Sequence, residues 1–122
     1  MTDNVNHPAH YTSHPSGKEC FDVVQYLPAA LFNAAKYIWR AGLKGNGKED
    51  VAKAVWYLKR YVSGPKCVVT GKGVQQIRSA ITTEWQAWCL DDRATLADTL
   101  IHLLLIGDAE GALKILKAGK DD

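Results

Sequence analysis

Apolar residues recur every three or four positions along most of this chain. In the clearest case the spacings are 3, 4, 4 and 3, and the residues are Val74, Ile77, Ile81, Trp85 and Trp88. This spacing places apolar side chains on one face of an α-helix. Only residues 67–70 have the composition of a brief strand or extended segment. Because 122 residues suffice for one compact domain and not for two, the sequence predicts a single all-α domain.

Breaks in the apolar pattern divide the chain into an arm and six helices. Residues 4–15 contain two prolines and no periodic pattern, which predicts an extended arm. Helices are expected at residues 18–27, 28–41 (ended by Gly42), 48–62, 74–88 and 95–106, with a last one between an Asp108 cap and Gly119. The short loop after Gly42 predicts an antiparallel hairpin. Residues 1–62 would thus form the arm and hairpin, and residues 63–122 a helical extension of the same domain.

The helical spacing also predicts which residues are buried. In the first two helices these are Phe21, Val24, Leu27, Leu31, Ala34, Ala35 and Ile38. Residues 95–106 are apolar nearly all round, so this helix needs cover on two sides. Self-association is the easiest source of that cover in a small chain, which predicts a homo-oligomer built through residues 63–122.

Composition excludes several classes of protein. With 47% hydrophobic and 23% charged residues, the chain is typical of a globular protein and not of a disordered one. A net charge of +2 gives no argument for a nucleic-acid partner. The longest apolar run, residues 100–106, is far shorter than the ~20 residues of a membrane span. Three cysteines without CxxC spacing predict reduced thiols, so we expect a cytoplasmic protein with no membrane partner.

Positive charge gathers in the first half of the chain. Residues 1–62 carry 8 Lys+Arg against 5 Asp+Glu, whereas residues 63–122 carry 7 against 8. The basic excess therefore surrounds the expected arm and hairpin, where it would attract an anionic ligand.

Four polar residues share the face of the second helix that lies opposite its apolar stripe. They stand at i, i+3, i+4 and i+7, and they are Asn33, Lys36, Tyr37 and Arg40. Lysine and arginine one turn apart can hold adjacent phosphate or carboxylate groups, the arginine by two parallel hydrogen bonds. The alternative is a solvated surface strip, the usual state of polar residues on an amphipathic helix.

The third helix carries a companion strip. Its members are Asp50, Lys53, Tyr57 and either Arg60 or Tyr61. Trp56 and Tyr57 lie next to basic residues and could stack on a nucleobase. The alternative is that both aromatic side chains pack against a neighbouring helix.

The arm contains His7, His10 and His14, with Tyr11 between them. No acidic or thiol ligand stands nearby to complete a metal site, so none is predicted. Histidines that fold over a phosphate, or that make structural hydrogen bonds, are the two remaining interpretations.

Residues 42–48 fit the pattern G-x-x-x-x-G-K, but they do not form a P-loop. Glu49 stands where a P-loop needs Ser or Thr, and the segment follows a helix instead of a strand. Lys44 and Lys48 could still meet an anion at the start of the third helix. The sequence shows no Ser–His–Asp, Cys–His or paired-carboxylate grouping.

Four motifs follow one another in the first half of the chain. They read NHPAHY at residues 6–11, ECFDVV at 19–24, NAAKYIWRAG at 33–42 and EDVAKAVWYL at 49–58. In these motifs the chain resembles the SaV-like family of small bacteriophage and prophage proteins, a domain of unknown function that includes a phage nucleotide kinase without a Walker motif. The resemblance covers about residues 4–62 and implies a phage protein in the infected host cell. It places these residues at motif positions: His7, His10, Tyr11, Asn33, Lys36, Tyr37, Arg40, Asp50, Lys53 and Tyr57.

Three functions are compatible with these features, and in the first two the partner is a nucleotide or another phosphorylated small molecule. The first is a nucleoside-monophosphate kinase, in which Lys36, Arg40 and Lys44 supply positive charge and Asp50 holds Mg²⁺ or takes a proton. The second is sequestration of a linear or cyclic nucleotide signal of host anti-phage defence, which needs no catalytic base. The third is inhibition of a host protein through the aromatic faces. In the first two cases Arg40→Ala should abolish binding without unfolding the chain.

Overall fold

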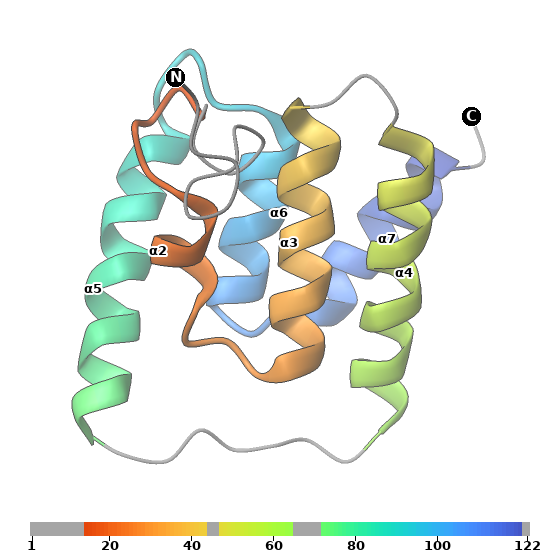
Figure 1. Cartoon of the computed structure of the whole chain (residues 1–122), viewed down its shortest axis with the longest axis horizontal. Helices are drawn as coiled ribbons and strands as arrows, with labels where there is room; N and C mark the ends of the chain where they lie inside the picture. Colours follow the sequence, from red (N-terminus) through yellow and green to blue (C-terminus); the bar gives the residue numbers. More distant parts are fainter. Residues whose placement is uncertain (1–13, 44–46, 65–71, 121–122) are drawn as a thin grey trace, which may run out of the picture.

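A computed structural model describes residues 14–43, 47–64 and 72–120 and forms six helices and no strand within them (Figure 1). The predicted all-α fold is therefore confirmed. The helices are α2 (Cys20–Val24), α3 (Ala29–Leu43), α4 (Gly47–Ser63), α5 (Lys72–Cys89), α6 (Leu96–Leu105) and α7 (Ala109–Lys120). Most of the predicted arm and the possible strand at residues 67–70 lie outside the described residues.

The helices form two layers with one helix at the side. α3 and α4 lie side by side and run in opposite directions, and α6 and α7 lie behind them (Figure 1). α5 flanks this arrangement, where it packs against α6 and the short helix α2. Because α6 contacts α3, α5 and α7, it occupies the centre of the fold. None of the described helices is both long enough and apolar enough to cross a membrane.

Two of the predicted helix ends are wrong. α3 continues through Gly42 to Leu43, and α7 contains Gly119. The glycine that does end a helix is Gly107, whose φ of +86° is the left-handed conformation that glycine adopts without strain. Its N–H donates to Leu104 O at 3.1 Å and the next N–H donates to Leu103 O at 2.8 Å, which satisfies the last carbonyls of α6.

The next residue, Asp108, starts α7 as predicted. Its Oδ1 accepts the N–H of Gly111 at 2.9 Å, the contact expected of a helix N-cap. α6 starts in a similar way, because the Thr95 hydroxyl accepts the N–H of Asp98 and the Asp98 side chain accepts the N–H of Thr95.

The predicted apolar stripe of α3 is confirmed, since all four of its residues are at most 2% exposed. Trp85 and Trp88 also belong to the core, as expected. Phe21 is the exception, because its side chain is 58% exposed and not buried. α2 buries a different face, formed by Cys20, Val23 and Val24.

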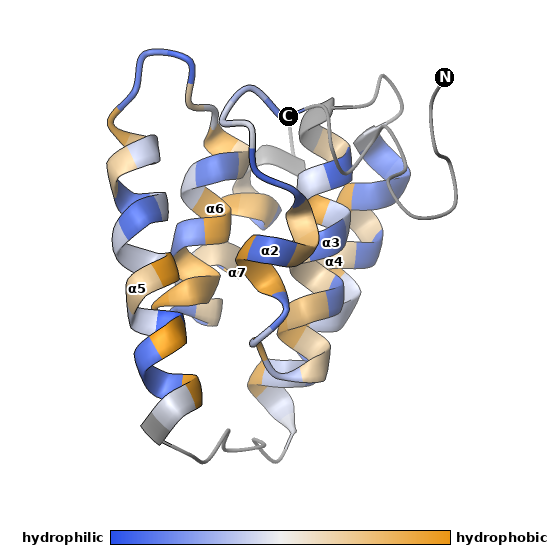
Figure 2. Cartoon of the chain, turned by 60° about the vertical axis from the view of Figure 1, so that its left-hand side comes forward, coloured by the Kyte–Doolittle hydropathy of each residue, from blue (hydrophilic) through white to orange (hydrophobic). Residues whose placement is uncertain are grey.

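α6 obtains its cover from within the chain. Leu100, Ile101, Leu104 and Leu105 are all buried against neighbouring helices. Figure 2 shows the apolar parts of α6 among the other helices, whereas hydrophilic residues dominate the outer side of α5. A second copy of the chain is therefore not needed to cover α6. Self-association stays a prediction, and it would have to use another surface.

Candidate functional site

The predicted strips of α3 and α4 meet across the boundary between the two helices. The rings of Tyr37 and Tyr57 stack there, with centroids 6.0 Å apart and planes inclined by 13°. The residues around this pair come from both helices and form what we call the cation–tyrosine cluster: Lys36, Tyr37, Arg40, Asp50, Lys53 and Tyr57. Helix periodicity explains the arrangement, because each strip occupies one helical face and the two faces adjoin.

Three cationic side chains surround the ring of Tyr37. Lys36 Nζ lies 5.0 Å from the ring centroid, Lys53 Nζ 5.2 Å and Arg40 Cζ 5.8 Å. Each contact is within the range at which the electron-rich face of an aromatic ring attracts a cation. The phenol ring thus holds three positive charges from two helices near one point.

Arg40 has one nearby carboxylate in the cluster. Its Nε lies 3.9 Å from Asp50 Oδ2, an ion pair that is too long to be a hydrogen bond. Asp50 is only 5% exposed and lies in the first turn of α4, where the helix dipole favours a negative charge. Arg40 Nε is buried and has no hydrogen-bond partner among the described residues. The cluster therefore contains a charged donor without an acceptor.

Lys53 is paired on its outer side. Its Nζ lies 3.1 Å from Glu49 Oε1 one helical turn away. This hydrogen bond and the charge of Glu49 raise the pKa of Lys53 above its ordinary value. Two carboxylates thus face three cations, which leaves one net positive charge at the site.

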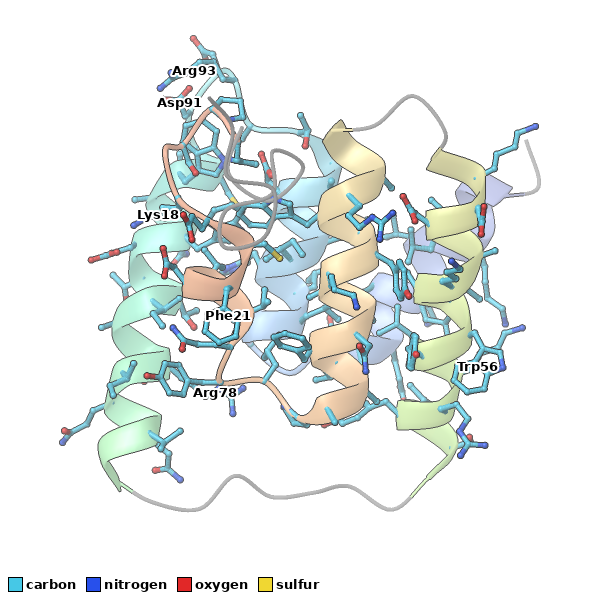
Figure 3. All side chains as sticks on the ribbon, in the orientation of Figure 1. Lys18, Phe21, Trp56, Arg78, Asp91 and Arg93 are labelled. Atoms are coloured by element: carbon cyan, nitrogen blue, oxygen red, sulfur yellow. The ribbon has the colours of Figure 1, made fainter. Side chains whose placement is uncertain are left out.

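The remaining predicted ligand residues do not join the cluster in the described part of the chain. Asn33 shares the face, but its Nδ2 donates to Ala29 O of its own helix at 3.1 Å. Trp56 is 55% exposed and points away from α3 (Figure 3). The Arg60 guanidinium covers its ring at 5.3 Å. Four further candidates lie outside the described residues: His7, His10, Tyr11 and Lys44.

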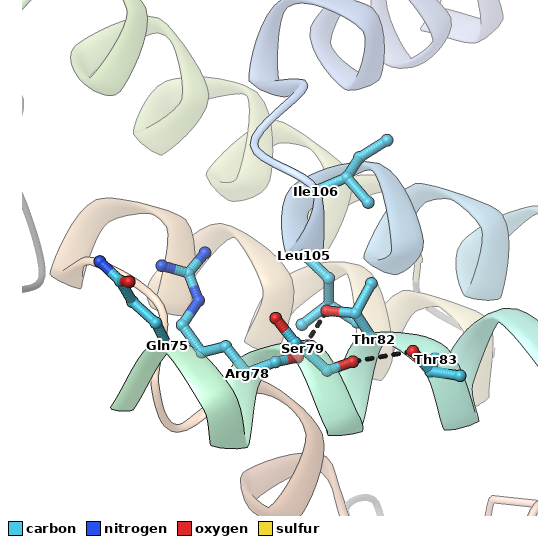
Figure 4. A pocket seen from close by; sticks show the side chains of 7 residues that line it. All are labelled: Gln75, Arg78, Ser79, Thr82, Thr83, Leu105 and Ile106. Carbon is cyan, nitrogen blue, oxygen red and sulfur yellow. Dashed lines mark hydrogen bonds between the residues drawn. The ribbon is translucent and has the colours of Figure 1, made fainter. Parts of the chain in front are cut away.

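Two hollows lined by described residues lie away from the cluster. A groove of about 520 Å³ runs between α5 and the end of α6, with Arg78, Ser79 and Thr82 on one wall and Leu105 on the other (Figure 4). A second hollow of about 450 Å³ lies where α3 begins and α4 ends, near Pro28. Neither hollow is lined by a residue of the predicted α3 strip.

A second polar site was not predicted from the sequence. His14 is buried, and its ring is enclosed by Trp39, Trp85 and Trp88 at centroid distances of 4.7, 5.3 and 5.4 Å. His14 Nε2 lies 2.7 Å from Asp98 Oδ1. The pattern Thr95-x-x-Asp98 predicts the start of a helix, but no local pattern in the sequence connects Asp98 with His14.

Asp98 is the centre of this second site. Its Oδ2 accepts the indole N–H of Trp88 at 2.9 Å and the backbone N–H of Thr95 at 3.0 Å. Its backbone carbonyl accepts the indole N–H of Trp85 at 2.9 Å. Burial raises the pKa of the Asp98 carboxyl, but the hydrogen bonds from His14, Thr95 and Trp88 outweigh this effect and leave it below its usual value. Asp98 is therefore a satisfied, ionised carboxylate inside the core.

Ser16, His14 and Asp98 have the residue types of a hydrolase triad, but their hydrogen bonds oppose that role. Ser16 Oγ lies 2.8 Å from His14 Nδ1, and the backbone N–H of Ser16 donates to the same Nδ1 at 3.0 Å. Because Nδ1 accepts the backbone N–H, it is not a free base for the hydroxyl. Ser16 Oγ also accepts the N–H of Lys18 at 3.2 Å. We assign this group to fold stability.

The described residues contain no group of three or more His, Cys, Asp or Glu side chains that could hold a metal ion. Asp50, the residue expected to hold Mg²⁺ in a kinase, is buried and lies beside Arg40. Mg²⁺ is usually bound through one or two carboxylates together with substrate phosphates. A buried carboxylate next to a guanidinium does not fit this requirement.

Comparison with known proteins identifies part of the chain. Residues 5–59 match the family model of a protein of unknown function, DUF3310. The match includes every residue of the cation–tyrosine cluster and ends within α4. Searches of curated proteins and of solved structures found no match. Over these residues, which are less than half of the chain, the protein is similar to a domain of unknown function, and the match assigns no activity.

Proposed function

We propose that the cation–tyrosine cluster binds the phosphate of a nucleotide or of a similar small molecule. The observation that carries the proposal is the convergence of Lys36, Arg40 and Lys53 within 5.0–5.8 Å of the Tyr37 ring. Like charges held this close repel one another unless anions compensate them. Glu49 and Asp50 compensate two of the three charges, and a bound phosphate would compensate the third.

The hydrogen-bonding state of Arg40 supports the same proposal. A buried donor without an acceptor costs about 1–3 kcal/mol of stability, and more when it is charged. Arg40 Nε is such a donor within the described residues. A phosphate oxygen is a strong acceptor for a guanidinium, and the two neighbouring lysines would add point charges to the remaining oxygens.

Binding without turnover fits the cluster better than catalysis. A catalytic base must lie within hydrogen-bond reach of the proton that it removes. Asp50, the base expected for a kinase, is 5% exposed and is held beside Arg40. Its geometry suits a residue that positions the guanidinium. The proposed activity is therefore sequestration of a phosphorylated nucleotide, and phosphoryl transfer is the alternative to test.

Isothermal titration calorimetry with AMP, GMP, CMP, TMP and cyclic dinucleotides tests the proposal. The double variant Lys36→Gln/Lys53→Gln should weaken binding of whichever nucleotide binds by at least about tenfold, equivalent to ~1.4 kcal/mol. The matched control is Lys114→Gln/Lys117→Gln, which removes the same charge from exposed positions of α7. No binding to the unmodified chain, or equal losses in the two variants, would overturn the proposal. ADP release in a coupled assay with ATP would show turnover instead of sequestration.

Arg40→Ala is a poor test of binding. The sequence led us to expect that this change leaves the fold intact. In the structure it would leave the buried carboxylate of Asp50 without its cationic partner. Removing one member of a buried ion pair is strongly destabilising. A loss of binding in this variant would therefore not separate a missing ligand contact from a weakened fold.

A further inference from the structure

The aromatic side chain of Phe21 lies on the surface of the protein. It lies in α2 beside the exposed Asp22, outside the buried face formed by Cys20, Val23 and Val24, and its side chain is 58% exposed (Figure 3). Its ring meets that of Phe32 on α3 edge to face, with centroids 6.2 Å apart and planes inclined by 81°. This geometry orients the two rings against each other and leaves much of the Phe21 surface open to solvent. Phe32 is itself partly buried against the core, so its contact fixes the exposed ring of Phe21 in one place on the surface.

The phenylalanine pair adjoins the cation–tyrosine cluster. Phe32 and Lys36 are four residues apart on α3, so they are neighbours on the same helical face, about 6 Å apart along the axis. Lys36 also lies close to the start of α2: burial raises the pKa of Cys20, the residue before Phe21, and the charge of Lys36 partly opposes that increase. Lys36 is thus positioned between the phenylalanine pair on one side and the Tyr37 ring on the other.

We infer that Phe21 and Phe32 form the subsite for the base of the nucleotide whose phosphate lies on the cation–tyrosine cluster. This inference rests on the proposed function and names the aromatic half of the ligand. A nucleoside monophosphate carries its planar base and its phosphate at the two ends of one ribose. An aromatic surface one helical turn from a group of cations matches that distribution of apolar and charged groups. Base–aromatic stacking tolerates any base, so the subsite selects nucleotides without choosing among them.

Trp56 is the other aromatic residue that could hold the base, and the geometry disfavours it. It lies on the outer side of α4 (Figure 3). The Arg60 guanidinium already covers its ring at 5.3 Å. Its ring also meets that of Tyr57 edge to face, with centroids 5.0 Å apart.

Calorimetry with two probes separates the base from the phosphate. The probes are ribose 5-phosphate, which lacks a base, and the nucleoside monophosphate that binds best among AMP, GMP, CMP and TMP. The unmodified chain should bind the nucleotide about tenfold or more tightly than ribose 5-phosphate. Phe21→Ala should remove that difference and leave ribose 5-phosphate binding unchanged, and Phe21→Tyr should restore it. The control is Leu90→Ala, which truncates an apolar side chain that is 84% exposed in the turn after α5.

The outcomes distinguish the subsite from the phosphate site. Equal binding of the two probes to the unmodified chain would overturn the base subsite and leave the phosphate site standing. An unchanged preference for the nucleotide in Phe21→Ala would do the same, because the base would then lie elsewhere. Binding of neither probe would overturn both. A thermal melt of each variant checks the fold, and Phe21→Leu, which keeps the apolar volume without the ring, replaces Phe21→Ala if that variant unfolds.

Discussion

His14 Nε2 lies 2.7 Å from Asp98 Oδ1, although 84 residues separate the two in the sequence. The contact joins the segment before α2 to the first turn of α6, the central helix of the fold. Both side chains are at most 6% exposed. A buried hydrogen bond to a charged group contributes more to stability than a neutral one on the surface, so this pair fastens the start of the described chain to its core.

Loss of His14 should therefore destabilise the protein. His14→Ala leaves a buried carboxylate without one of its donors, and we expect the free energy of unfolding to fall by about 3 kcal/mol. Urea unfolding followed by circular dichroism measures this change. The comparison is His102→Ala, at a partly buried histidine of α6 whose Nδ1 has no hydrogen-bond partner among the described residues. Equal losses in the two variants would mean that the contact with Asp98 contributes little.

The same contact predicts how stability depends on acid. Burial opposes ionisation of Asp98, but hydrogen bonds from His14, Thr95 and Trp88 hold the folded pKa of its carboxyl below the unfolded value. A depressed carboxyl pKa contributes stability that is fully present above the unfolded pKa, about 3.9, and is lost as the pH falls through the folded value. Unfolding free energies measured from pH 6 to pH 3 should fall less steeply in Asp98→Asn than in the unmodified chain. Parallel curves for the two proteins would contradict this assignment.

Apolar periodicity predicts the helices well but not the face that α2 buries. The spacing of Phe21, Val24 and Leu27 suggested one face, whereas Cys20, Val23, Val24 and Leu27 fit the i, i+3, i+4, i+7 pattern better. The better register requires Cys20 to count as a small apolar residue, which is how buried cysteine behaves. Two helix ends are also predicted wrongly, because glycine ends a helix where it adopts the left-handed conformation, as Gly107 does with a φ of +86°.

The candidate site was predictable only in part, for geometric reasons. Helix periodicity alone places Lys36, Tyr37 and Arg40 on one face. The stacking of Tyr37 on Tyr57 depends on how far α4 is shifted along α3, and no spacing within either helix contains that information. Contacts such as that of His14 with Asp98 join distant segments, so a single sequence cannot reveal them.

Cys20 should be unreactive in the folded protein. Burial raises the pKa of its thiol to about 12, even though Lys36 opposes the increase. Because the thiolate is the reactive form, alkylation by iodoacetamide at pH 8 should be far slower for Cys20 in the folded chain than in urea. Mass spectrometry of the cysteine-containing peptides measures the rate at each site. A rate for Cys20 that does not change between the folded and unfolded states would contradict its buried position.

Self-association is expected through the first half of α5. The apolar face of this helix consists of Val74, Ile77, Ile81, Trp85 and Trp88. It is buried at Trp85, which is 0% exposed, but it is uncovered at Ile77, which is 44% exposed. Residues 73–83 contain one charged residue, Arg78, which lines the groove beside the exposed Ile106 (Figure 4). Protein interfaces are poor in lysine and acidic residues but retain arginine, and this face has the same composition. With so few charges, a second copy can pair with this face without repulsion.

Light scattering after size exclusion measures the mass of the assembly directly. We expect a multiple of the 13.4 kDa chain for the unmodified protein. Ile77→Glu should return the mass to that of one chain, because burying an unpaired carboxylate in the interface is costly. Leu90→Glu places the same charge at an apolar position that is 84% exposed and lies outside the apolar face of α5, so it should leave the assembly intact. A single-chain mass for the unmodified protein would refute self-association, and dissociation by Leu90→Glu alone would move the interface away from Ile77.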